Sequence, residues 1–97
     1  MTTHKQSRRA RLHLVITGRV QGVGFRFSAY DYANDLALAG WVRNVASGEV
    51  EIVAEGSMES LQTLAAWAHL GPPSAHVTEV REDWLDSTGE FTEFRIR

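Results

Sequence analysis

The stretch LHLVITGRVQGVGFRFSAY, residues 12–30, joins an alternating apolar run to a helical pattern through a segment that contains three glycines. Residues 12–17 place apolar side chains at every second position, which is typical of a strand buried on one face. Over residues 25–38 apolar side chains recur at helical spacing, and Gly40 is the expected end of that helix. The pattern therefore predicts a strand, a glycine-rich loop and a helix in direct succession.

A hairpin is expected after this first helix. Residues 41–45, WVRNV, are short, β-branched and aromatic, and residues 49–55 alternate with apolar side chains on one face. The Ser47–Gly48 pair between them is a turn signal. We therefore expect the two segments to pair as neighbouring antiparallel strands.

A second helix and two further strands complete the pattern. Ser57 is a favourable N-cap for a helix that runs to Leu70, and the GPPS motif that follows ends it because proline cannot continue a helix. Residues 77–85 and 91–97 are predicted strands around a turn at residues 87–89. The order β-α-β-β-α-β with an extra C-terminal strand predicts an α+β, ferredoxin-like sandwich in which two helices cover one face of an antiparallel sheet.

Composition limits the classes of function. The chain has 97 residues, a length that suits one folded domain, for which we predict residues 11–97 after a disordered basic tail at residues 1–10. The net charge of -2 argues against a nucleic-acid-binding protein, and no apolar run approaches the ~20 residues of a membrane span. The chain has no cysteine, which excludes thiol chemistry and is typical of a cytoplasmic protein. Its four histidines lack metal-ligand spacing, so we expect no metal site.

The glycine-rich loop has the ingredients of a phosphate site. Gly22 and Gly24 can adopt positive φ, which turns successive backbone N–H groups toward one side. The helix that follows adds its unpaired first amides and the positive end of its dipole. Arg26, at the junction, supplies a planar guanidinium that matches the oxygens of a phosphate. The loop is therefore predicted to bind a single phosphate group.

Other phosphate-loop motifs fit the loop poorly. A P-loop requires a lysine that the chain lacks here, and Phe27 stands where a dinucleotide fingerprint has its third glycine. GVGFRF is similar to an RNA-binding signature, but that signature lies on a late strand rather than in a first loop. A Cys-x5-Arg phosphatase loop would need cysteine at Val20. No residue of the loop can attack the bound phosphate, so the nucleophile is expected to be water.

Asn44 is the candidate that orients this water. Strand alternation places Asn44 on the same face as Val42 and opposite Trp41 and Arg43. An asparagine near a hairpin end is also a common turn or cap residue, so this position alone leaves both roles open.

The two elements GRVQGVGFR and GWVRN, with Asn44 eighteen residues after Arg26, and the later GEVE and GPPSAHV, resemble the acylphosphatase family over essentially the whole domain. The resemblance implies a metal-independent and cofactor-free hydrolase of small acyl phosphates, with inorganic phosphate as product or inhibitor. It implies that Asn44 positions the water. The residues implied to bind the phosphoryl group, through their amides and the Arg26 side chain, are Gln21, Gly22, Val23, Gly24, Phe25 and Arg26.

Some features depart from the family or stay open. Ala37 and Leu38 occupy a place where the family often has Gly-Leu, so the first helix is expected to end later than in its relatives.

We expect a monomer that binds no nucleic acid and no membrane. The alternative function is a non-catalytic module that binds a phosphate or carboxylate ligand on the same fold, and an RNA-binding module is third.

Overall fold

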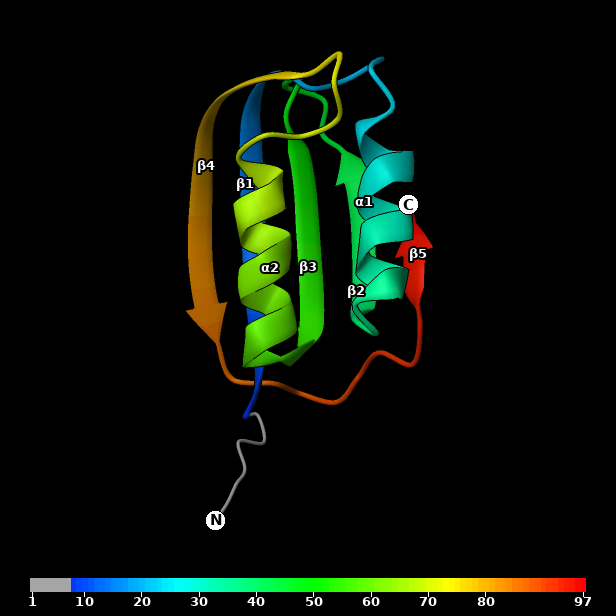
Figure 1. Cartoon of the computed structure of the whole chain (residues 1–97), viewed down its shortest axis with the longest axis vertical. Coiled ribbons are helices and arrows are strands. Elements are labelled where there is room, and N and C mark those ends of the chain that lie inside the picture. Colours follow the sequence, from blue (N-terminus) through cyan, green and yellow to red (C-terminus); the bar gives the residue numbers. More distant parts are fainter. Residues whose placement is uncertain (1–7) are drawn as a thin grey trace.

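Seven helices and strands follow one another in the computed structural model, which describes residues 8–97 (Figure 1). They are β1 (Arg9–Arg19), α1 (Phe25–Asp35), β2 (Ala39–Asn44), β3 (Val50–Ser57), α2 (Met58–Ala68), β4 (His76–Leu85) and β5 (Phe94–Ile96). The predicted tail at residues 1–10 lies mostly outside the described residues, and its last two residues belong to β1. The element order of the ferredoxin-like prediction is confirmed.

The five strands form one mixed sheet in the order β4-β1-β3-β2-β5. The predicted hairpin of β2 and β3 is confirmed, but β5 pairs in parallel with β2, so the prediction of an antiparallel sheet was wrong for this strand. The turn expected at residues 87–89 is also not a hairpin turn. After β4 the chain crosses below the sheet to its opposite edge, as Figure 1 shows, and so enters β5 in the direction of β2. Alternation identifies a strand, but it does not identify the strand's partner.

The core lies between the sheet and the two helices. In Figure 1 both helices lie in front of the same face, with α2 over β1 and β3 and α1 over β2 and β5. The alternating apolar residues predicted to share one face of a strand are buried: Leu12, Leu14, Ile16, Val50, Ile52 and Ala54. Val42 is buried as well. Within residues 8–97, neither helix combines the length and the apolar character needed to cross a membrane.

The first helix ends earlier than predicted. α1 stops at Asp35, and Ala37 adopts the left-handed conformation with φ of 58°, a position usually taken by glycine. The N–H of Leu38 then donates to the carbonyl of Ala33 at 2.9 Å, which closes the helix end. Gly40, predicted as the stop, lies in β2. A Cβ atom there would lie 1.9 Å from a β3 carbonyl oxygen, so this glycine permits close strand packing.

Candidate active site

A bulge near the end of β1 leads the chain into the glycine-rich loop. The register of β1 against β4 shifts between Thr17 and Gly18, and Gly18 has φ of 129°. Further along, Gly22 and Gly24 have φ of 75° and 82°, and a Cβ atom on either would meet no neighbour within 4 Å. Backbone conformation, rather than lack of space, therefore requires glycine at these two loop positions.

The backbone N–H groups of residues 21–27 are unpaired: among the hydrogen bonds of the described residues, none is donated by these groups. Gly24 is the N-cap of α1 and has no side chain to cap the helix, whose first turn also has no acidic residue. The loop and the helix start therefore offer a row of free N–H donors at the positive end of the helix dipole, which are the groups that an anion site requires.

Packing beneath the loop holds the start of α1 in place. Phe25 is 1% exposed, and its ring centroid lies 5.1 Å from that of Trp67 on α2. Gly71 leaves room for this ring, because a Cβ atom there would approach it to 2.7 Å. Arg26 follows directly and is partly exposed, and no carboxylate of residues 8–97 lies within ion-pair distance of it. A fixed backbone thus presents a guanidinium that is not neutralised by these residues.

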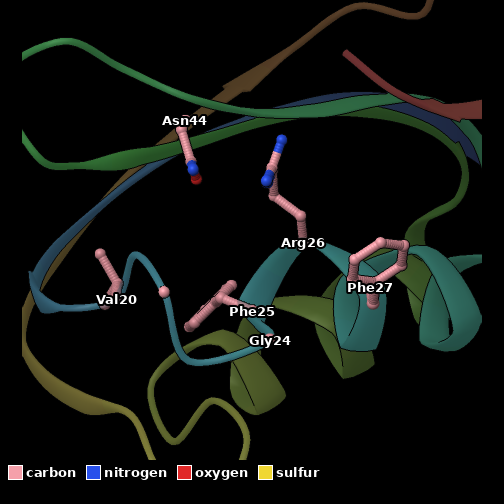
Figure 2. A pocket seen from close by; sticks show the side chains of 7 residues that line it. Val20, Gly24, Phe25, Arg26, Phe27 and Asn44 are labelled. Atoms are coloured by element: carbon pink, nitrogen blue, oxygen red, sulfur yellow. The ribbon is translucent and has the colours of Figure 1, made fainter.

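A cavity of about 170 Å³ lies between the loop, the start of α1 and the end of β2. It is lined by Val20, Gly22, Gly24, Phe25, Arg26, Phe27 and Asn44. Figure 2 shows the side chains of Arg26 and Asn44 extending into the same space from the helix and from the strand. Asn44 lies on the helix-covered face with Val42, whereas Arg43 lies on the opposite face and pairs with Glu51 at 2.7 Å. The strand alternation predicted for this segment is confirmed.

The lining differs from the predicted set at four positions. Gln21 and Val23 do not line the cavity, and the Gln21 side chain points to the β2–β3 turn instead. Val20 and Phe27 were not predicted as site residues, yet both line it. Val20 is an apolar residue inside a glycine-rich stretch, and this pattern could have indicated that its side chain is buried. Phe27, which is 66% exposed, had no sequence signal beyond its place next to Arg26.

The side chains that line the cavity offer few kinds of chemical group. Within the part of the chain that the structure describes, Arg26 and Asn44 supply the only polar side chains of the lining, so the cavity can bind an anion and orient a neutral molecule beside it. The described lining side chains include no histidine, carboxylate or hydroxyl that could act as a nucleophile or general base. Residues 8–97 also contain no group of three or more histidine, aspartate or glutamate side chains placed to hold a metal ion.

Comparisons with known proteins find similar sequences and similar folds. Residues 12–96 match the family model described as Acylphosphatase. An acylphosphatase of Methylococcus capsulatus is 53% identical over 88 residues, which are 89% of this chain and 94% of that protein. The structure of an acylphosphatase from Coxiella burnetii matches with a TM-score of 0.88 and 36% identity over 97% of this chain and 100% of that one. That of an acylphosphatase from Bacillus subtilis matches with a TM-score of 0.87 and 36% identity, covering 91% and 98%.

Proposed function

Because this chain belongs to the acylphosphatase family, we propose that Arg26 and the loop amides bind the phosphoryl group of an acyl phosphate while Asn44 orients the attacking water. The enzyme hydrolyses the carboxyl-phosphate anhydride of a small acyl phosphate to a carboxylate and inorganic phosphate. One observation carries the assignment of roles: among residues 8–97, Arg26 and Asn44 are the only polar side chains that line a cavity beside a row of unpaired N–H groups.

The reaction requires few groups from the protein. A water oxygen forms a bond to phosphorus, and the bond between phosphorus and the acyl oxygen breaks. The carboxylate leaves as a weak base, so no general acid is needed. The guanidinium of Arg26 and the N–H groups, which are already oriented, stabilise the negative charge on the phosphoryl oxygens. Such preorganised donors usually make the largest single contribution to lowering an activation barrier.

Asn44 has the complementary task. Its side-chain carbonyl can accept a hydrogen bond from the water, which directs a lone pair of the water oxygen toward phosphorus. Because the lining side chains of the described residues include no base, the proton of the water passes to an oxygen of the phosphoryl group itself. Both products then leave as anions, and inorganic phosphate competes with substrate for the same donors.

The finer features of the function are also proposals. We expect the enzyme to act as a cytoplasmic monomer and to need no metal or other cofactor. The non-catalytic module is not favoured, because the relatives that match nearly the full chain are themselves acylphosphatases.

Hydrolysis of benzoyl phosphate, measured with a chelator present, tests the assignment. We expect full turnover by the wild type and a loss of about 10²–10³-fold in kcat/KM for Arg26→Ala and for Asn44→Ala, the usual cost of one transition-state donor. Asn44→Ala should keep its inhibition by inorganic phosphate, whereas Arg26→Ala should lose it.

Two neighbours serve as matched controls. Arg19→Ala removes an exposed arginine beside the same loop, and Arg43→Ala removes a side chain from the far face of the strand that holds Asn44. Both should keep wild-type rates. Wild-type turnover by Arg26→Ala would refute the phosphate site, and loss of wild-type activity in the chelator would refute metal independence.

A further inference from the structure

The two halves of the site lie on separate segments of the chain. The unpaired N–H groups and Arg26 belong to the loop and the start of α1, whereas Asn44 is the last residue of β2. Each segment is positioned by its own packing. The reaction, however, depends on the distance and direction between the phosphorus atom held by one segment and the water held by the other.

The side chain of Gln21 spans these two segments. Its Nε2 group donates to the carbonyl oxygen of Val45 at 2.8 Å and to that of Glu49 at 2.9 Å. Val45 directly follows Asn44, and the same two carbonyls accept the bonds that close the hairpin turn, from Gly48 and Val45 respectively. Within residues 8–97, these are the only hydrogen bonds between the loop at residues 20–24 and the turn at residues 45–49.

We infer that Gln21 is a positioning residue that sets Asn44 relative to the phosphate-binding amides. The inference rests on the roles proposed above for Arg26 and Asn44. Gln21 does not line the cavity, so its side chain acts through the turn rather than on the substrate. A displacement of ~1 Å between reacting groups can lower a rate by about 10²-fold, which is the scale of effect that one misplaced turn would have.

The chemistry of the contact makes glutamine specific here. Both partners are carbonyl oxygens, so the amino group of the amide, with its two hydrogens, must face them. Methionine is of similar length and donates no hydrogen bond. Glutamate has the same shape, but its ionised carboxylate would direct negative oxygens at two carbonyl oxygens. Once protonated, the glutamate carboxyl can donate one hydrogen bond and restore half of the link.

The experiment compares Gln21→Met and Gln21→Glu with the wild type in benzoyl phosphate hydrolysis. For both variants we expect kcat to fall about tenfold or more at neutral pH. The constant for inhibition by inorganic phosphate should stay unchanged, since the amides and Arg26 remain. As the pH falls through the glutamate pKa, about 4.3 or higher, Gln21→Glu should recover part of its kcat. Gln21→Met and the wild type should show no such recovery.

Ser47→Ala is the matched control. The Ser47 hydroxyl donates to a Glu49 carboxylate oxygen at 2.8 Å in the same turn, and this hydrogen bond does not involve the loop, so its loss should leave kcat unchanged. Wild-type kcat in both Gln21 variants, or no acid recovery in Gln21→Glu, would overturn the inference. Arg26→Ala and Asn44→Ala in the same assay distinguish a failure of the positioning role of Gln21 from a failure of the proposed function. If both are inactive while the Gln21 variants are fully active, only the positioning role fails.

Discussion

Two clusters of backbone N–H donors lie at opposite ends of the sheet. One binds a carboxylate of the protein itself, and the other is open to an anionic ligand. The active-site loop lies at the end where Asn44 pairs with Val50. At the other end, Glu55 pairs with Ala39, and its carboxylate is 2% exposed. Both clusters include a glycine with positive φ, Gly24 in the loop and Gly89 in the connection between β4 and β5.

The second cluster is filled by the chain itself. The carboxylate of Glu55 accepts hydrogen bonds from the N–H of Thr88 at 3.0 Å and of Gly89 at 2.9 Å, from the hydroxyls of Ser87 and Thr88, and from Arg11 at 3.1 Å. Burial alone would raise the pKa of Glu55, but the bonds from Gly89, Thr88 and Arg11 outweigh it and lower the pKa to about 2.

The difference shows how similar donors serve stability in one place and function in the other. The carboxylate of Glu55 is hydrogen-bonded by groups of the protein itself, so the cluster holds in place the segment that brings β5 to its edge of the sheet. In the loop the N–H donors bind no anionic group of residues 8–97, so they are available to a phosphoryl group. Variants that affect one cluster should therefore leave the other property intact.

The largest effect is expected at Glu55. Glu55→Gln places an amino group against several donors and should lower the free energy of unfolding by roughly 3 kcal/mol, measured by urea denaturation. The kcat of the folded fraction should not change. Glu51→Gln is the control on the same strand, because Glu51 is partly exposed and, within residues 8–97, is bound only by the side chains of His13 and Arg43. It should cost about 1 kcal/mol or less. An equal cost for the two variants would contradict the special role of the buried cluster.

Acid should destabilise the protein through the same carboxylate. The pKa of Glu55 is about 2 when folded and 4.5 at its ordinary value, so the unfolded chain binds more protons between these values. The stabilisation is complete above pH 4.5 and is lost as the pH falls toward 2, with about 2 kcal/mol gone by pH 3. Unfolding curves across this range should show the loss in the wild type and a much smaller one in Glu55→Gln. Parallel curves for the two proteins would show that other carboxylates cause most of the loss of stability in acid.

Inorganic phosphate should stabilise the wild type through the open cluster. At a concentration ten times its Kd the gain is about 1.4 kcal/mol, which a thermal shift measures. Glu55→Gln should show the same gain, and Arg26→Ala should show almost none. A gain that persists in Arg26→Ala would place the phosphate somewhere else.

The smallest effect is expected at Ala37, which belongs to neither cluster. Its φ of 58° disfavours alanine, so Ala37→Gly should stabilise the protein by about 1 kcal/mol in urea denaturation. Neither kcat nor the stabilisation by phosphate should change. A loss of stability would mean that the flexibility glycine adds to the unfolded chain outweighs the relief of strain.

Much of the fold could be predicted because its signals are local. Alternation and helical spacing located all seven elements, and Ser57 was identified as the cap of α2, where its hydroxyl accepts from the N–H of Ser60 at 3.1 Å. The predictions that failed concern long-range partners or weak local preferences. The parallel pairing of β5 depends on a connection held by Glu55, and the early end of α1 depends on an alanine in a conformation that usually requires glycine.

The sequence by itself determined which chemical groups this protein presents: a flexible run with Gly22 and Gly24, a guanidinium where the helix begins, and an amide at the end of a short strand. These follow from residue type and spacing, which act over a few residues. Only the tertiary structure decided which of the groups meet. It placed Asn44 across the cavity from Arg26, turned the side chain of Gln21 to the hairpin, and enclosed Glu55 among donors more than thirty residues away. Such contacts depend on the pairing and packing of distant segments, which local patterns do not encode.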